Sequence, residues 1–179
     1  TPGDPLMLLK NYLRTLPGAE FIAEEDAEHI VAAMRIDDYT DGHVFVYQDK
    51  LAKELHLLLK GAVKVSHYGP TGRNHTLRML EPGDFFGLLS LSDGKPAVAS
   101  CVAVGDVRVA SLPFSAYMLL YQPHSDIGCR FQYLLAAQLA RDLRYRHAML
   151  RNLLARIYTG KPLDTPSCGL MEVPPLLDD

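Results

Sequence analysis

The spacing of apolar residues changes twice along the chain, and a proline-rich tail follows, so that the chain divides into four predicted segments. In residues 1–38, apolar side chains recur at intervals of three and four, which is typical of amphipathic helices. In residues 39–113, they alternate with other residues in short runs separated by glycine and proline, which predicts antiparallel strands. In residues 114–159 the helical interval returns and predicts a long helix, whereas the proline-rich tail 160–179 predicts no long regular element.

The regular spacing of the predicted strands favours a double-stranded antiparallel β-roll, or jelly roll, over alternating βαβ units. Gly69, Pro70 and Gly72 separate two alternating runs and predict a hairpin with a polar tip. Gly105 and Asp106 are expected to end one strand and begin the next. The predicted fold class is therefore mainly β with flanking α: N-terminal helices, the β-roll and a long C-terminal helix.

Composition narrows the class of protein. The chain contains no run of roughly 18 apolar residues, so no membrane span is expected. Its formal net charge of −3 gives no basic footprint for nucleic acid over the whole chain. Cys101, Cys129 and Cys168 are odd in number and show no C-x-x-C spacing, which argues against a disulfide framework or a zinc site. We therefore expect a cytoplasmic protein.

Residues 81–100, here called the cassette, carry the pattern with the clearest chemical meaning. Pro-Gly-Asp precedes Phe-Phe-Gly, a short apolar helix is expected next, and a proline with small residues and a serine closes the stretch. Gly87 lets the backbone approach a ligand closely, and the helix that follows it would point unpaired N–H groups at an anion. The pattern predicts a binding site for a small anionic ligand.

These motifs resemble the phosphate-binding cassette of the cyclic-nucleotide-binding domain family. That family includes catabolite-activator-type regulators, regulatory subunits of cyclic-nucleotide-dependent kinases and cyclic-nucleotide-gated channels. The resemblance extends from the N-terminal helices to the long helix ending near Ile157. It implies a cyclic nucleotide, cyclic AMP or cyclic GMP, as the ligand, and a cyclic dinucleotide is the alternative. The ligand-binding residues that it implies are Phe86, Gly87, Leu88, Leu89, Pro96, Ala97, Ala99 and Ser100.

Two positions depart from the family pattern. The family has Glu after Phe-Gly, to accept from the ribose 2′-hydroxyl, and Arg after the proline, to hold the cyclic phosphate. Here these positions are Leu88 and Ala97, although Pro96 stands nine residues after Gly87 as in the family and Ser100 also matches. A charged hydrogen bond contributes about 1.5–3 kcal/mol, so losing both would weaken a cyclic mononucleotide about 10²- to 10⁴-fold.

Lys95 and Arg78 are the candidates to replace the missing guanidinium. Lys95 directly precedes the proline, and Arg78 lies on the strand that enters the cassette. The alternative interpretation is that both are solvated surface charges.

From residue 130 onward the long helix is basic, because it carries Arg130, Arg141, Arg144, Arg146, Arg151 and Arg156 against the single acid Asp142. The resemblance implies that this helix covers the ligand and forms a homodimer, and its apolar stripe is long enough for coiled-coil-like pairing. A solvated face, an acidic partner and a lipid surface are the alternatives. No recognition helix follows it in the chain, so we expect no direct DNA binding by this chain.

No signature of an enzyme or a metal site is evident, because neither a nucleophile with a base nor paired carboxylates stand together. His67 and His75 would face each other across the hairpin, but exposed histidines are the default interpretation. We therefore expect a regulatory, ligand-sensing domain with no catalytic residue and no metal. The alternatives are a ligand-free dimerisation or interaction scaffold and a domain that binds a different anion.

Overall fold

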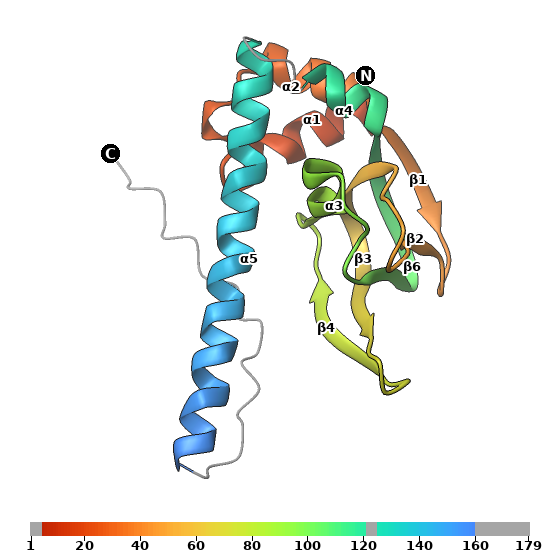
Figure 1. Ribbon diagram of the computed structural model, residues 1–179. Coiled ribbons are helices and arrows are strands. Elements are labelled where there is room, and N and C mark those ends of the chain that lie inside the picture. Colours follow the sequence, from red (N-terminus) through yellow and green to blue (C-terminus); the bar gives the residue numbers. More distant parts are fainter. Residues whose placement is uncertain (1–4, 121–124, 160–179) are drawn as a thin grey trace. The chain divides into compact units, whose positions relative to one another are not determined.

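The computed structural model describes residues 5–120 and 125–159 and contains a six-stranded antiparallel sheet flanked by helices (Figure 1). The N-terminal helices are confirmed, but β1 starts before the expected boundary at residue 38. The first elements are α1 (Pro5–Thr15), η1 (Ala19–Phe21), α2 (Glu24–Ala32) and β1 (Arg35–Tyr39).

The sheet confirms the predicted β-roll fold class. The remaining strands are β2 (Val44–Val46), β3 (Glu54–Tyr68), β4 (Asn74–Leu80), β5 (Phe85–Phe86) and β6 (Ser100–Pro113). The strand order is β1-β6-β3-β4, with β2 also paired to β6 and β5 to β3. The two longest strands, β3 and β6, therefore form the centre of the sheet.

The two predicted turns have different outcomes. The hairpin between β3 and β4 is confirmed, with His67 directly opposite His75. The predicted break at residues 105–106 is wrong, because β6 runs through it as one strand. The pairing jumps from Lys60 with Arg108 to Ala62 with Val104, which makes this point a bulge opposite Gly61. The glycine and aspartate bend the strand without reversing the chain.

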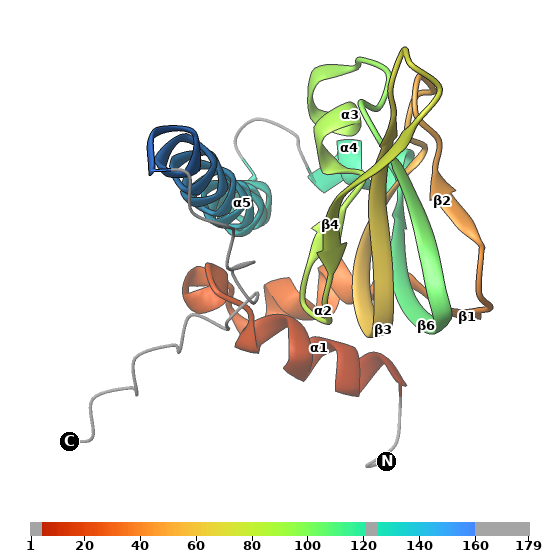
Figure 2. The same ribbon diagram turned by 90° about the horizontal axis from the view of Figure 1, so that it is seen from below.

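Alternation along β3 separates two hydrophobic clusters. The helix-side cluster contains Leu55 and Leu57 of β3 and packs against residues of α1, α2, α4 (Phe114–Leu120) and the start of α5 (Asp126–Thr159). Figure 2 shows α1 and α2 together along one side of the sheet. The roll-side cluster contains Val46, Leu58, Val63, Leu80, Phe86, Cys101, Ala103, Val107 and Val109. The cassette lies where these two clusters meet along the sequence, because Phe85 belongs to the first and Phe86 to the second.

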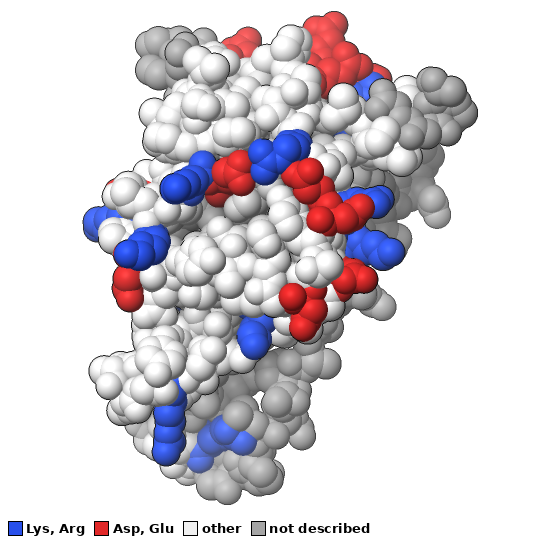
Figure 3. Space-filling model, turned by 90° about the vertical axis from the view of Figure 1, so that its right-hand side faces the viewer, with Lys and Arg blue, Asp and Glu red and all other residues white. Residues whose placement is uncertain are grey.

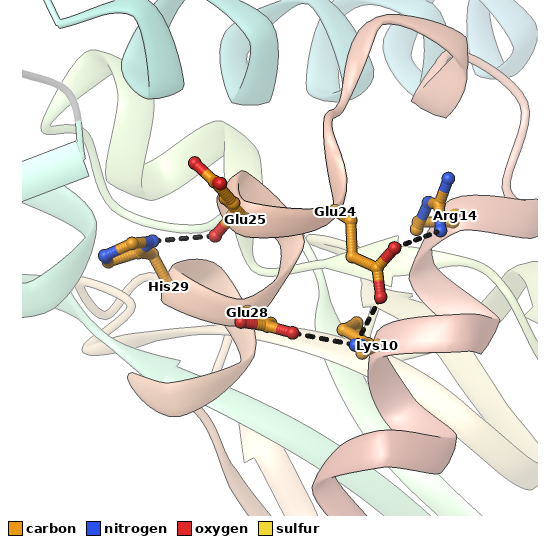
Figure 4. A network of polar contacts seen from close by, with 6 residues as sticks. All are labelled: Lys10, Arg14, Glu24, Glu25, Glu28 and His29. Atoms are coloured by element: carbon orange, nitrogen blue, oxygen red, sulfur yellow. Dashed lines mark hydrogen bonds and ion pairs between the residues drawn. The ribbon is translucent and has the colours of Figure 1, made fainter.

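A buried lysine joins the N-terminal helices. The Lys10 ammonium of α1 donates to Glu24 (2.9 Å) and Glu28 (2.8 Å) of α2, and Arg14 lies 3.7 Å from Glu24 (Figure 4). The first turn of α2 is acidic, as expected for the positive end of a helix. Asp26 in that turn also pairs with Arg130 of α5. These ion pairs tie α1, α2 and the start of α5 together.

The long C-terminal helix is confirmed as α5, and the chain divides within it into two compact units, residues 1–138 and 139–179. In the first unit, Phe131, Leu134 and Leu135 are buried in the helix-side cluster. In the second unit the helix carries exposed apolar side chains: Leu139, Leu143, Leu150, Leu153, Leu154 and Ile157. Among the described helices, none has the length and apolar content needed to cross a membrane. The prediction for residues 160–179 lies outside the described residues.

Candidate functional site

The first half of the cassette is built into the core. Phe85 and Phe86 form β5 against β3, and Gly87 then starts α3 (Leu88–Asp93) with φ of 81°. A Cβ at Gly87 would lie 2.8 Å from the carbonyl oxygen of Glu54, too close for any other residue. Glycine is therefore required here by the fold itself, in addition to any role in approaching a ligand.

Helix α3 is held to residues 47–52, here called the cassette loop. The Ser90 hydroxyl donates to the carbonyl of Lys95 (2.6 Å) and accepts from the N–H of Ala52 (3.0 Å). Gly94, with φ of 65°, ends the helix and turns the chain back toward β6. The short helix predicted from the sequence is thus present and fixed at both ends.

The second half of the cassette runs beside the same loop. The Ala97 N–H donates to the carbonyl of Lys50, and its carbonyl accepts from the N–H of Asp49, both at 2.8 Å. The Ser100 hydroxyl accepts from the N–H of Gln48 (2.9 Å). Both backbone polar groups of Ala97 are thus satisfied within the protein, as is one acceptor position of Ser100.

The structure separates the two positions that depart from the family pattern. Leu88 is 4% exposed and belongs to the helix-side cluster, whereas Ala97 is half-buried and packs against the roll-side cluster. Of the other predicted site residues, Phe86 and Ala99 are buried, Gly87 and Ser100 are half-buried, and Leu89, Lys95 and Pro96 are exposed. Leu88 thus serves the hydrophobic core.

The alternative interpretation of Arg78 as a solvated surface charge does not fit the structure. Its side chain is 18% exposed, and its guanidinium donates to Asp84 at 3.1 Å. The Asp84 carboxylate also accepts from the N–H of Glu81 (2.9 Å) and from the side-chain amide of Gln138 (3.1 Å). Asp84 and Gln138 are both buried, so this polar group links β4, the cassette and α5 away from solvent.

Two polar residues beside the cassette were not predicted as part of the site. Gln138 lies within α5, and its spacing in the sequence gives no sign of a contact with the cassette. His56 lies directly opposite Phe86, its ring stacks on that of Phe86 with centroids 4.9 Å apart, and its Nδ1 lies 2.8 Å from the Ser111 hydroxyl. Burial lowers the pKa of His56 to about 4. In the sequence, the position of His56 between Leu55 and Leu57 is the one signal that its side chain lies on the face of β3 opposite to theirs.

Metal and thiol chemistry receive no support from the described residues. In the part of the chain that the structure describes, no group of three or more His, Cys, Asp or Glu side chains could hold a metal ion. Cys101 is buried, and burial raises the pKa of its thiol to about 12, so the thiol stays protonated. Cys101 is therefore a small core residue of the roll-side cluster.

Charges of both signs lie side by side over the face drawn in Figure 3. Arg108 of β6 and Asp38 of β1 form a surface ion pair joined by two hydrogen bonds of 2.7 and 2.8 Å. Because both side chains are exposed, this pair contributes little to stability.

Comparisons with known proteins agree with this geometry. Residues 36–124 match the family model for the cyclic nucleotide-binding domain. The chain is 32% identical over 123 residues to the Cyclic AMP receptor protein of Thermus thermophilus, covering 69% of this chain and 55% of that relative. It is 28% identical over 116 residues to a cAMP-dependent protein kinase regulatory subunit of Blastocladiella emersonii, covering 65% of this chain and 29% of that subunit. The chain therefore spans 55% or less of the length of these two relatives.

A solved structure supports the fold independently. The crystal structure of a cyclic nucleotide-binding domain from Methylobacillus flagellatus has a TM-score of 0.71 with this chain at 21% identity. The match covers 84% of this chain and 83% of that one. At 21% identity, the likeness shows that the two chains share the arrangement of their helices and strands.

Proposed function

Because the chain belongs to the cyclic-nucleotide-binding domain family, we propose that it is a regulatory domain. We propose that its cassette binds a small anionic ligand of the cyclic nucleotide class, with a lower affinity than the family pattern implies. The observation that carries this proposal is the pair Leu88 and Ala97 at the two positions where the family has charged residues. The backbone of the cassette is present, and the two groups that would grip the ribose and the phosphate are absent from it.

Leu88 supports a change in affinity because its side chain is fully committed to packing. At 4% exposure it contributes to the helix-side cluster and has no polar atom to offer a ribose hydroxyl. Losing one charged hydrogen bond costs about 1.5–3 kcal/mol of binding free energy. A ligand that needs this contact would bind about ten- to a hundredfold more weakly.

Ala97 supports the same conclusion for the phosphate. An arginine there would offer a planar fork of donors to two phosphate oxygens, which a methyl group cannot replace. The neighbouring Lys95 is exposed and could supply only a point charge screened by water. Lys95 is therefore a weak substitute for the missing guanidinium.

The proposed mechanism is a shift in the population of two arrangements of the cassette. A ligand that contacts α3 and Ser100 would favour one position of the short helix, and Asp84 connects the cassette to Gln138 of α5. The start of α5 would then move with the cassette and change what the rest of this helix contacts. The two relatives are named as a regulatory subunit and a receptor protein, and we propose no catalytic activity for this chain.

The second candidate is a ligand-free scaffold that dimerises through α5. Six apolar side chains on α5 beyond residue 138 are 40–77% exposed, from Leu139 to Ile157. Such a stripe favours pairing with a second copy. The same pairing is compatible with ligand sensing, so dimerisation alone does not separate the two candidates. A cyclic dinucleotide as an alternative ligand remains within the proposed class.

A thermal-shift screen separates the two candidates. Cyclic AMP, cyclic GMP and cyclic dinucleotides would each be added up to millimolar concentration. A ligand present at 100 times its Kd adds about 2.7 kcal/mol of stability, which raises the midpoint of thermal unfolding by several degrees. We expect a shift only at high concentration. The absence of any shift with all of these compounds would favour the scaffold.

A further inference from the structure

Arg78 lies on the same face of the sheet as the end of the cassette. It pairs with Val65 of β3, and Val65 pairs on its other side with Cys101 of β6, the residue after Ser100. Directly opposed residues in antiparallel strands project their side chains to the same face. Cys101 belongs to the roll-side cluster, and Val65 is partly buried and packs against it. Arg78 thus projects toward that side, two strand spacings, or about 10 Å, from the cassette's last residues.

Asp84 already provides a carboxylate for this guanidinium. The pair is largely withdrawn from water, with side-chain exposures of 18% for Arg78 and 9% for Asp84. Asp84 has two further donors, the Glu81 N–H and the Gln138 amide. If Arg78 turned to another anion, the Asp84 carboxylate would therefore keep two hydrogen bonds and avoid the full cost of an unpaired buried charge.

We propose that Arg78 is the cation that holds the ligand's anionic group in this cassette, and that Asp84 occupies Arg78 until the ligand replaces it. This inference rests on the proposed function, because it names the residue that binds the phosphodiester of the same ligand. A phosphodiester fits the exchange chemically, since it carries one negative charge and presents two oxygens to the guanidinium fork. The exchange would thus replace the single charge of the Asp84 carboxylate by the single charge of the phosphodiester.

The exchange also gives the ligand a route to α5. Both Arg78 and Gln138 donate to the Asp84 carboxylate. When the ligand takes Arg78, Asp84 retains its bonds to the cassette backbone and to Gln138, so the cassette turn and α5 stay joined through a carboxylate that has lost its cation. Without that cation, the Asp84 carboxylate accepts the retained bond from the Gln138 amide more strongly, and this strengthened bond is the route to α5.

The test replaces the Asp84 carboxylate by an uncharged side chain of the same shape. Asp84→Asn releases Arg78 from its counter-charge, and we expect cyclic AMP to bind at least about tenfold more tightly than to the wild-type chain, as measured by titration calorimetry. Arg78→Lys keeps the charge but loses the fork, and we expect it to weaken binding by about tenfold. Asp38→Asn is the matched control, because it makes the same charge change at an exposed ion pair, and its Kd should equal that of the wild-type chain.

Three outcomes bear on the inference separately from the proposed function. If the wild-type chain binds cyclic AMP and neither Asp84→Asn nor Arg78→Lys changes the Kd, the inference is overturned and the proposed function stands. If only Asp84→Asn binds measurably, the inference is supported. If no variant binds, both are overturned. Circular dichroism checks whether Asp84→Asn folds. If it does not fold, the comparison of Arg78→Lys with the wild-type chain decides the question. The double variant Arg78→Gln/Asp84→Asn is neutral at both positions and should bind cyclic AMP no more tightly than the wild-type chain.

Discussion

In the first half of the cassette, residues 84–91, most side chains are buried, whereas in the second half, residues 95–100, most are exposed or half-buried. The first half is packed between the two hydrophobic clusters, and the second half is held by backbone hydrogen bonds to the cassette loop. Substitutions in the first half should therefore change folding stability, and those in the second half should change what is bound. For this reason, changing Leu88 should alter folding stability, whereas changing Ala97 should alter ligand binding.

The largest expected effect is that of Leu88→Glu, which would restore the family's residue. Because Leu88 lies in the helix-side cluster, the carboxylate would be buried without a partner, and we expect a loss of about 3–5 kcal/mol of unfolding free energy. Leu89→Glu is the matched control, since Leu89 is 54% exposed, and it should change stability by less than about 0.5 kcal/mol. Urea denaturation measures both. Equal losses for the two variants would contradict the distinction drawn between buried and exposed cassette positions.

The next effect is a dependence of stability on pH through His56. Its folded pKa of about 4 lies below the ordinary value of 6.5, so the unfolded chain binds a proton at a higher pH than the folded chain. Stability is therefore lost as the pH falls from about 6.5 to about 4, by about 3 kcal/mol in total. Urea denaturation across this range should show the loss in the wild-type chain.

His56→Gln isolates this contribution, because it removes the titrating group at the buried position. The loss between pH 6.5 and 4 should shrink in that variant, while His75→Gln, at an exposed hairpin position, should keep it. An unchanged profile in His56→Gln would mean that other groups dominate the acid response.

A smaller loss is expected for Gly87→Ala. The backbone at Gly87 has a positive φ, and the added Cβ would lie 2.8 Å from the Glu54 carbonyl oxygen, so we expect a loss of about 2 kcal/mol. Gly94→Ala is the control at the other end of α3, because its φ is also positive but its Cβ would meet nothing within 4 Å. It should cost about 1 kcal/mol or less. A cost at Gly94 as large as at Gly87 would indicate that backbone strain alone, without the steric contact, explains the requirement for glycine.

The sequence predicted the fold well because strand alternation and helical spacing are local signals. The hairpin at Gly72, the short helix after Gly87 and the long helix to Ile157 all follow from such signals. The break at Gly105 was mispredicted because a glycine looks the same in a turn and in a bulge, and only the shift of register between β3 and β6 at Gly61 distinguishes them.

The site was less predictable, because its polar contacts join residues far apart in the chain. Asp84 meets Gln138 across 54 positions, and His56 meets Ser111 across 55. Spacing along the sequence carries no information about such pairs. The sequence identified Arg78 as a cation near the cassette, but only the structure shows that Asp84 already neutralises it.

Titration calorimetry of cyclic AMP into the wild-type chain and Ala97→Arg tests the central claim most directly. Ala97 lies in the second half of the cassette, so the arginine should cost less than about 1 kcal/mol of stability and supply the missing guanidinium. The account predicts weak binding by the wild-type chain and binding at least about tenfold tighter by Ala97→Arg. Val98→Arg, at the neighbouring exposed position, should bind like the wild type. A wild-type chain that binds cyclic AMP as tightly as Ala97→Arg would contradict the claim that this cassette has a weakened hold on cyclic nucleotides.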